Sequence, residues 1–218
     1  MTRGGRNAAE WLEADGLGGF ASGTVSGIRT RRYHALLLAA ATPPTGRAVL
    51  VNGFDAWVET QQGRFALTSQ QYAPDTVDPD GSSRVDSFTD EPWPHWSFRL
   101  GDGTLVEQEI FVPKGVPVVA LCWRILGARV PATLTVRPFL SGRDYHALHH
   151  ENPDFRFEAE MRGNYVGWRP YASVAAVTAL ANGGYFHEPL WYRNFLYEEE
   201  RARGLDHVED LASPGLFR

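Results

Sequence analysis

The sequence predicts an all-β fold, mainly an antiparallel sandwich, from three observations. Roughly nine short apolar or alternating stretches are separated by turn residues, a spacing typical of sandwiches. One stretch, residues 154–162, alternates strictly between apolar and charged residues, as a strand with one wet face does. Long amphipathic helical patterns are absent. A chain of 218 residues can form one large all-β domain.

The first part of the chain predicts three strands and a long loop. The glycine-dense residues 16–27 predict tight turns. The apolar run 35–41, bounded by Thr-Pro-Pro, predicts a buried strand, and residues 49–58 and 64–68 predict two more. Residues 73–94 are rich in Pro, Asp, Gly and Ser and predict a long loop.

The middle of the chain predicts a hairpin followed by a buried strand. Gly101-Asp102-Gly103 separates two strand-like stretches, residues 95–100 and 104–112, and such a turn is typical of a hairpin. Residues 118–126 are apolar apart from Arg124, which predicts a strand buried on both faces.

The last part predicts three more strands, a helix and a linker. Residues 132–140, 154–162 and 173–181 have strand patterns. Residues 189–204 begin with Pro and end with Gly, which favours a helix. The Ser-Pro-Gly at residues 213–215 is typical of a linker.

Composition excludes several classes of protein. The formal net charge is −5, with 22% charged residues, and a general nucleic-acid binder would need a basic face. No apolar run approaches the roughly 20 residues of a membrane span, so no membrane partner is expected. The single cysteine, Cys122, lies in an apolar stretch and is expected in the core. One cysteine and no apolar leader indicate the cytoplasm.

Common catalytic and cofactor patterns are missing from the sequence. The glycines at residues 16–19 fit neither a dinucleotide loop nor a phosphate loop, and we expect a hairpin turn there. His146, His149 and His150 could bind a metal, but hydrogen-bonded loop histidines are favoured. The acidic residues near the C-terminus are expected on a solvated face. No catalytic residue, metal or cofactor is therefore assigned.

Tryptophans outside the apolar strands suggest a binding or docking surface. They lie in expected loop or edge segments, whereas Trp123 is expected in the core. Exposed tryptophans can pack against sugar rings, or they can dock onto another domain, and both alternatives remain open. These residues are Trp11, Trp93, Trp96 and Trp191.

Several long motifs resemble one known family. They are Glu10-Trp11-Leu12, residues 16–24, residues 30–37, Arg143-Asp144-Tyr145-His146, and the tail from Trp191 to Leu211. In this order they resemble the N-terminal domain of bacterial and archaeal glycogen debranching enzymes of the amylo-α-1,6-glucosidase type. The resemblance spans nearly the whole chain. Ala35 is a small departure, because the family usually has glycine there.

The resemblance implies a β-supersandwich similar to the galactose-mutarotase superfamily. It also implies that the domain precedes an (α/α)₆ barrel, which carries the catalytic carboxylates and acts on glycogen or another α-glucan. We then expect residues 1–9 to be a flexible lead, residues 10–188 the sandwich, and residues 189–218 a segment leading toward the barrel. The domain itself would be non-catalytic.

The resemblance points to two polar patches as candidate site residues. One lies at the start of the buried strand and the other in a loop, and each could brace a loop or contact sugar, with bracing favoured. A free-standing carbohydrate-binding module and a mutarotase-like enzyme using His146 with a nearby Glu remain alternatives. The candidates are Trp11, Arg31, Arg32, Tyr33, His34, Arg143, Asp144, Tyr145, His146 and Trp191.

Overall fold

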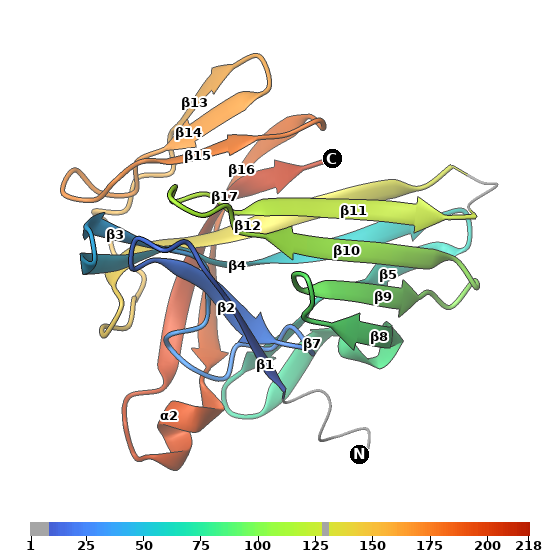
Figure 1. The fold of residues 1–218 in the computed structure, drawn as a ribbon, viewed down its shortest axis with the longest axis horizontal. Helices are drawn as coiled ribbons and strands as arrows, with labels where there is room; N and C mark the ends of the chain where they lie inside the picture. The colour runs from blue at the N-terminus through green and yellow to red at the C-terminus, as the bar shows by residue number, and fades with distance from the viewer. Residues whose placement is uncertain (1–8, 128–130) are drawn as a thin grey trace.

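The computed structural model describes residues 9–127 and 131–218 and confirms the all-β class (Figure 1). Its strands form three antiparallel sheets of ten, four and three strands. The expected lead falls almost entirely outside the described residues. No helix in the described residues is long and apolar enough to cross a membrane. In chain order the elements are β1 (Glu10–Ala14), β2 (Phe20–Thr24), β3 (Ala35–Thr42), β4 (Thr45–Thr60), β5 (Gly63–Ala66), β6 (Ser69–Tyr72), β7 (Thr76–Asp80), the 3₁₀ turn η1 (Ser82–Arg84), β8 (Val85–Thr89), β9 (His95–Arg99), β10 (Leu105–Phe111), β11 (Ala120–Leu126), β12 (Thr133–Asp144), β13 (Ala159–Arg162), β14 (Tyr165–Trp168), β15 (Val177–Leu180), β16 (Tyr185–Leu196), α2 (Glu198–Ala202) and β17 (Val208–Phe217).

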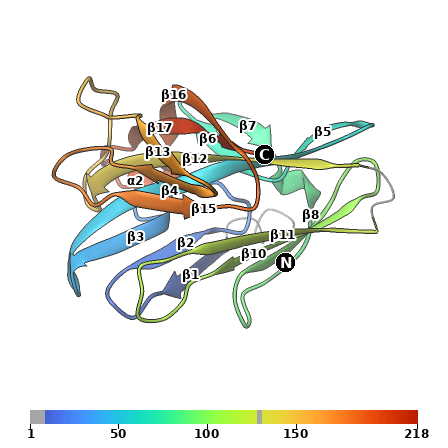
Figure 2. The ribbon, with the colours of Figure 1, turned by 90° about the horizontal axis from the view of Figure 1, so that it is seen from above.

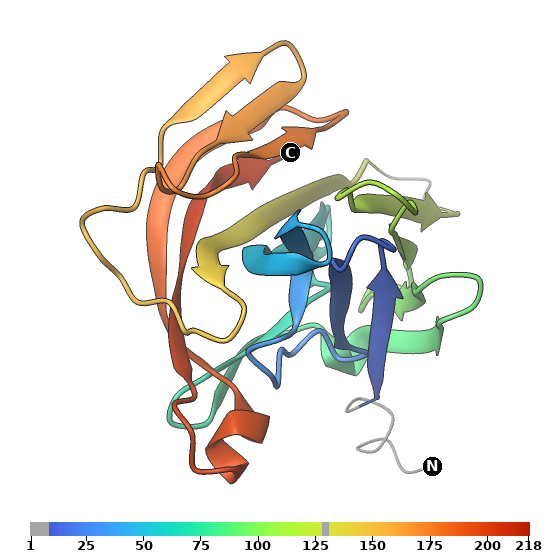
Figure 3. The same cartoon turned by 60° about the vertical axis from the view of Figure 1, so that its left-hand side comes forward.

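The ten-stranded sheet curls strongly. Its order is β1-β2-β3-β4-β12-β17-β16-β6-β7, and β5 pairs with β4. Only Leu67 and Thr68 separate β5 from β6, so this short segment joins β4 on one side to β16 on the other. The Leu67 N–H donates to the carbonyl oxygen of Ala56 at 2.8 Å, which continues the pairing past β5. The long, bent β16 and β17 are visible in orange and red in Figure 3.

The main core lies between the large sheet and the two smaller ones. Figure 2 shows β10 and β11 as a layer apart from β4 and β12. Leu50 and Val58 on β4 belong to the same buried cluster as Val106 and Ile110 on β10 and Trp168 on β14. Each fully buried side chain of this size contributes about 1.5–3 kcal/mol, so these contacts hold the three sheets together.

A second, smaller core lies on the opposite face of the large sheet, inside its curl. Phe139, Phe195 and Leu211 are buried there, with Tyr72 and Tyr192 packed against them. Adjacent residues of β12 and β17 belong to the main core instead, because successive strand residues point to opposite faces. The large sheet is therefore covered on both faces in this region.

Several predicted elements are confirmed. The apolar run 35–41 is β3, and residues 49–58 lie within β4. The glycines at residues 16–19 lie between the paired strands β1 and β2. The predicted hairpin joins β9 to β10, where the Leu100 N–H donates to the Thr104 carbonyl oxygen at 2.9 Å. Short-range patterns were sufficient for each of these.

The prediction of one long loop over residues 73–94 is wrong. The segment contains β7, η1 and β8. Both strands stand at the edge of a sheet, β7 in the ten-stranded sheet and β8 in the four-stranded one. An edge strand tolerates proline, because one side of its backbone needs no partner, and Pro79 lies in β7. The composition therefore resembled that of a loop.

The expectation of a doubly buried strand over residues 118–126 is also wrong. Strand β11 begins at Ala120, and its residues alternate between exposed and half-buried. It forms the edge of the four-stranded sheet. Cys122 is consequently exposed instead of packed in the core, and Trp123 is only partly buried.

The regular pattern over residues 154–162 is a strand only from Ala159 onward. Phe155 precedes the strand and is buried against aromatic side chains of other segments, which satisfies the apolar residue without sheet pairing. The stretch 173–181 likewise gives only β15. In both regions the strand is shorter than the alternation suggested.

The C-terminal segment differs most from its prediction. Strand β16 takes up the first part of the expected helix, residues 189–204, and only Glu198–Ala202 is helical. Residues 213–215, expected as a linker, are buried within β17. Both strands belong to the ten-stranded sheet, so the expected boundary after residue 188 falls inside β16.

Candidate functional site

The Arg31–His34 motif lies directly before β3, and its histidine is buried. His34 Nδ1 accepts the Thr30 N–H at 3.1 Å, so Nε2 carries the proton and faces Glu10 Oε1 at 3.3 Å. Burial lowers the pKa of His34 to about 4, although Glu10 opposes the shift. His34 is therefore neutral at pH 7 and acts as a structural support. Arg31 Nε donates to the same Glu10 oxygen at 2.5 Å.

The Arg143–His146 motif lies at the end of β12, and its arginine is buried. Arg143 forms an ion pair with Glu209 and donates to the carbonyl oxygens of Asp144 and Tyr145 at 3.2 and 3.3 Å. Burial by itself lowers the pKa of Arg143, but the charge of Glu209 outweighs it and the pKa is raised. The guanidinium is therefore charged and fixed by several partners.

Asp144 and Arg143 are neighbours in the second motif, but their side chains have different partners. Asp144 does not form an ion pair with Arg143 in the described structure; Arg143 pairs with Glu209. Asp144 Oδ1 instead accepts the His146 N–H at 2.8 Å, a local turn contact. The two neighbouring residues thus brace the loop independently.

The two motifs, far apart in sequence, meet through arginine side chains and backbone carbonyls. Arg143 Nη2 donates to the Arg32 carbonyl oxygen at 2.6 Å. In return, Arg32 Nη1 donates to the His146 carbonyl oxygen at 2.7 Å. The Tyr33 hydroxyl lies 3.1 Å from His146 Nδ1. This reciprocal exchange holds the two loops in one arrangement.

Glu209 on β17 is the centre of this region. Its carboxylate accepts hydrogen bonds from Arg143 and the Tyr197 hydroxyl, from the His149 N–H at 2.9 Å and from Asn52 Nδ2 at 3.3 Å. Burial is the largest cause that raises the pKa of Tyr197, and the charge of Glu209 adds to it. We call these five residues, Asn52, Arg143, His149, Tyr197 and Glu209, the Glu209 cluster.

A second buried acid, Glu200 on α2, holds the Arg31–His34 motif from the other side. Glu200 Oε2 accepts the Arg32 N–H at 3.3 Å, and Oε1 lies 3.6 Å from Arg32 Nε. Arg32 Nη2 also donates to the Asp206 carbonyl oxygen at 3.0 Å. The short helix α2, in orange-red in Figure 3, is thereby attached to the loop before β3.

Sequence reasoning missed both buried acids. The acidic run near the C-terminus was expected on a solvated face, and this is wrong for Glu200 and Glu209, which are buried. The available signal was local: Glu209 lies in Val208-Glu209-Asp210-Leu211, a short stretch of a strand flanked by apolar residues. Only the fold shows that its partners are Arg143 and Asn52.

Trp191 and His149 pack against each other instead of forming an exposed surface. Their rings are stacked at 5.5 Å between centroids, and Trp191 is half-buried on β16. His149 Nδ1 donates to the Asp210 carbonyl oxygen at 2.8 Å, so Nε2 must accept from the Tyr171 hydroxyl at 2.6 Å. Burial lowers the pKa of His149, which fits this neutral tautomer.

Trp11 lies on an edge strand as expected, but it is not exposed. Trp11 and Trp96 are only 8% and 3% exposed, and their rings meet edge to face at 5.6 Å. The indole N–H of Trp11 donates to the Thr24 carbonyl oxygen at 3.3 Å. The expectation that these two tryptophans are exposed is wrong. Trp93 remains half-exposed and packs against Phe111.

One aromatic group of the two motifs does reach the surface. Tyr33 and Tyr145 are half-buried and His146 is exposed. The rings of Tyr145 and His146 lie 3.9 Å apart, and Tyr33 lies 5.8 Å from each. The guanidinium of Arg47 lies 5.6 Å from the Tyr145 ring. We call Tyr33, Tyr145 and His146 the surface aromatic group.

The three loop histidines have separate surroundings. His146 faces Tyr33, His149 is buried, and His150 is exposed 3.8 Å from Asp210. Across residues 9–127 and 131–218, no group of three or more His, Cys, Asp and Glu side chains is arranged to hold a metal ion. In the same residues no carboxylate lies within 4.0 Å of a ring nitrogen of His146, so the geometry offers it no acid–base partner.

Comparison with known proteins identifies the family. A model of the N-terminal part of glycogen debranching enzymes matches residues 9–218. Searches of curated proteins and of solved structures each returned no match. The matched region includes both motifs and the segment that carries Glu200 and Glu209. The chain therefore belongs to the family of glycogen debranching enzyme N-terminal domains.

Proposed function

We propose that this chain is a non-catalytic N-terminal domain of a glycogen debranching enzyme-like glycoside hydrolase. It packs on a following (α/α)₆ catalytic barrel and lines part of the glucan site, and so supports hydrolysis of α-1,6 branches in glycogen or another α-glucan. Family membership supports the first part. The single cysteine fits a reducing compartment, so we place the protein in the cytoplasm.

The proposal that this domain packs on a barrel and lines part of the glucan site rests on the convergence of three segments that are far apart in the sequence. Arg32 lies in the loop before β3, Arg143 in β12 and Glu209 in β17. Arg143 contacts both of the others, because it donates to the Arg32 carbonyl oxygen and forms an ion pair with Glu209. Such a buried polar network rigidifies a region when its members are satisfied. A rigid end of the sheet is a suitable support for another domain and for a positioned sugar chain.

The motif residues divide into two roles within this proposal. The half-buried Arg32 and the buried Arg143 and His34 brace the loops, because their polar atoms are directed to backbone carbonyls, acids and an amide. The surface aromatic group offers ring faces, which suit the C–H faces of glucose units. Bracing and sugar contact therefore belong to different residues of the same motifs.

The test uses the domain expressed in one chain with its catalytic barrel. Arg143→Ala and His34→Ala are expected to lower stability while leaving kcat/KM per folded molecule close to that of the wild type. Tyr33→Ala and His146→Ala are expected to lower stability less than Arg143→Ala does and to raise KM for a branched glucan. If the surface variants leave KM unchanged, the domain does not line the glucan site.

A second candidate function, a free-standing carbohydrate-binding module, is favoured by the surface aromatic group alone. It predicts that the isolated chain binds maltooligosaccharides. Calorimetry at millimolar ligand should then show heat that Tyr33→Ala removes. Tyr165→Ala is the matched control, because Tyr165 is a half-buried tyrosine of the three-stranded sheet. Absence of heat with the wild type would exclude this role without affecting the first proposal.

A further inference from the structure

The tail motif from Trp191 to Leu211 contains the sequence Arg203-Gly204-Leu205-Asp206, which lies between α2 and β17. These four residues are exposed, whereas Glu200 and Glu209 of the same tail are buried. Bracing of the loops from inside therefore accounts for the two buried acids but not for the exposed side chains. We call these four residues the 203–206 segment.

The way in which α2 ends fixes the backbone of the 203–206 segment. The Gly204 N–H donates to the Arg201 carbonyl oxygen and the Leu205 N–H donates to the Glu200 carbonyl oxygen, both at 3.0 Å. This pair of bonds is a Schellman motif, which needs a left-handed residue directly after the helix cap. Gly204 has a φ angle of +70°, which glycine adopts without strain. Asp206 therefore follows a defined turn.

Arg32 holds Asp206 beside the surface aromatic group. Arg32 Nη1 donates to the His146 carbonyl oxygen at 2.7 Å, and Nη2 donates to the Asp206 carbonyl oxygen at 3.0 Å. Because one planar guanidinium makes both bonds, the two oxygens lie within about 8 Å of each other. The Tyr197 N–H donates to the His207 carbonyl oxygen at 2.8 Å, which fixes the residue after Asp206. The two loops are therefore neighbours on one surface.

The polar groups on this surface are complementary to sugar hydroxyls. Within residues 9–127 and 131–218, Asp206 contacts Arg32 through its backbone carbonyl, and its exposed carboxylate has no hydrogen bond or ion pair. The Tyr33 hydroxyl lies 3.1 Å from His146 Nδ1, a contact that leaves Nε2 of the exposed ring for a ligand. A carboxylate only accepts, whereas a hydroxyl or a ring nitrogen can donate or accept. Sugar hydroxyls can satisfy both kinds of group.

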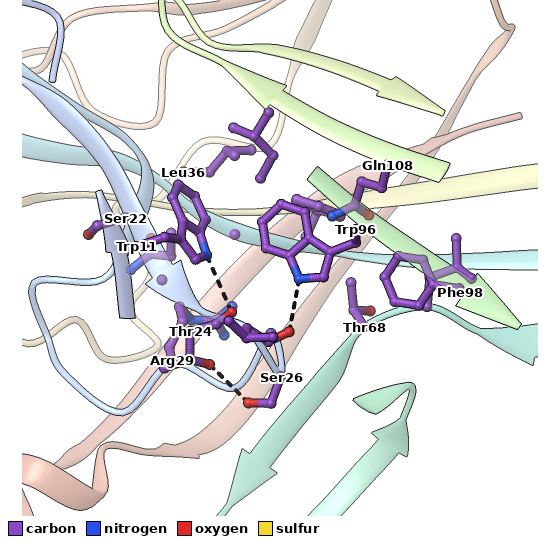
Figure 4. Close-up of a pocket in the computed structure, with 18 residues that line it drawn as sticks. Trp11, Ser22, Thr24, Ser26, Arg29, Leu36, Thr68, Trp96, Phe98 and Gln108 are labelled. Atoms are coloured by element: carbon purple, nitrogen blue, oxygen red, sulfur yellow. Dashed lines mark hydrogen bonds between the residues drawn. The ribbon is translucent and has the colours of Figure 1, made fainter. Parts of the chain in front are cut away.

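The pocket lined by Trp11 and Trp96 suits a sugar less well (Figure 4). The indole N–H of Trp11 donates to the Thr24 carbonyl oxygen at 3.3 Å, and that of Trp96 donates to the Val25 carbonyl oxygen at 2.9 Å. Both donors are therefore used inside the domain, and the two rings pack against each other. These observations favour a glucan contact at the surface, where ring faces and polar atoms meet solvent.

We infer that Asp206 binds the glucan, with its carboxylate accepting two neighbouring hydroxyl groups of a glucose unit that packs on the surface aromatic group. This inference rests on the proposed function, because it adds a binding residue to the same surface. It also defines the chemistry of the ligand. A neutral sugar with adjacent free hydroxyls fits, since each hydroxyl donates to the carboxylate. A phosphate group at these positions would meet a like charge, so unmodified glucan is the ligand.

The test measures KM and kcat for a branched glucan, with the domain expressed in one chain with its catalytic barrel. Asp206→Ala should raise KM about tenfold or more, because it removes hydrogen bonds to a charged group. The kcat should stay unchanged, because such a residue binds the ground state and the transition state equally. Asp206→Asn should raise KM less, since its amide oxygen still accepts a hydroxyl.

Two controls separate binding from structure. Asp90→Ala removes another exposed aspartate, in the loop after β8 of the four-stranded sheet, and should leave KM unchanged. The urea unfolding midpoint of Asp206→Ala should equal that of the wild type, because the side chain makes no hydrogen bond or ion pair in the described part of the chain. A role in folding would lower this midpoint, and a large loss there would contradict the inference.

The outcomes distinguish this inference from the proposed function. If Tyr33→Ala raises KM and Asp206→Ala does not, the domain lines the glucan site but Asp206 does not bind sugar. If Asp206→Ala lowers kcat and leaves KM unchanged, the 203–206 segment acts through the following domain. Either result would overturn the inference alone. If neither variant changes KM, the proposal that the domain lines the glucan site fails as well.

Discussion

Arg143 and Glu209, which stand 66 residues apart in sequence, form an ion pair with side chains only 3% and 0% exposed. The pair joins β12 to β17, two neighbouring strands in the middle of the strand order of the large sheet. Arg143 also holds the Arg32 carbonyl, and Glu209 also holds the His149 N–H. One buried contact therefore fixes several loops at the same end of the sheet.

Removing one partner of this pair should be costly. Arg143→Met leaves the Glu209 carboxylate buried without its cation, and such a change costs about 3–5 kcal/mol of unfolding free energy. Urea unfolding at pH 7 measures the effect. Arg124→Met is the control, because the Arg124 pair with Glu107 is exposed on β11 and should leave the midpoint close to that of the wild type. Equal midpoints for the two variants would show that Arg143 is not a structural hub.

His34 should make stability depend on pH. Its pKa is lowered from 6.5 to about 4, mainly by burial. Between these values the unfolded chain binds more protons than the folded one, so stability falls as the pH is lowered from 6.5 to 4. A shift of this size corresponds to about 3 kcal/mol. Urea unfolding at a series of pH values gives the profile.

A variant isolates this contribution from that of other groups. His34→Asn keeps an acceptor for the Thr30 N–H but cannot titrate. Asp55 has the opposite influence, because burial raises its pKa, and His149 has the same influence as His34. Both remain in the variant, so the difference between the two profiles reports His34. Parallel profiles would mean that His34 does not titrate in this window.

Gly81 should not tolerate a methyl group. A Cβ there would meet the backbone carbonyl carbon of Leu67 and lie 2.6 Å from the Thr68 nitrogen, and neither atom can move freely. The φ angle of −89° suits any residue, so the effect is purely steric. Gly81→Ala should lower the unfolding free energy by about 1–3 kcal/mol in urea unfolding.

The matched control for this change is Gly184→Ala. A Cβ at Gly184 would meet nothing closer than 3.7 Å, so its stability should equal that of the wild type. Equal losses from both variants would contradict the steric argument. A large loss only at Gly81 would show that the segment after β7 is fixed tightly to the residues between β5 and β6.

The strands and turns that were predicted correctly are those that depend only on residues close together in the sequence. The strand-like stretches at residues 95–100 and 104–112 correspond to β9 and β10, and the Gly-Asp-Gly turn correctly predicted the hairpin between them. The family motifs also identified Arg32 and Arg143 as special. Each of these signals is local, because turn type and strand period act over a few residues.

Long-range pairing could not be predicted in the same way. Nothing near Glu209 indicates that Asn52 and Arg143 complete its shell, because those partners come from other strands. The Pro at the start and the Gly at the end of residues 189–204 favoured a helix, but pairing with β17 makes the first part of this stretch a strand. Tertiary contacts overrode local propensity there.

Cys122 provides a direct test of the solvent-exposed face of β11. Residues along this strand alternate between exposed and half-buried, and the Cys122 thiol lies on the exposed face. The folded chain should therefore react with one equivalent of an aromatic disulfide reagent without denaturant, and Cys122→Ser should abolish the reaction. A thiol that reacts only after unfolding would mean that β11 is covered, as its apolar sequence alone suggests.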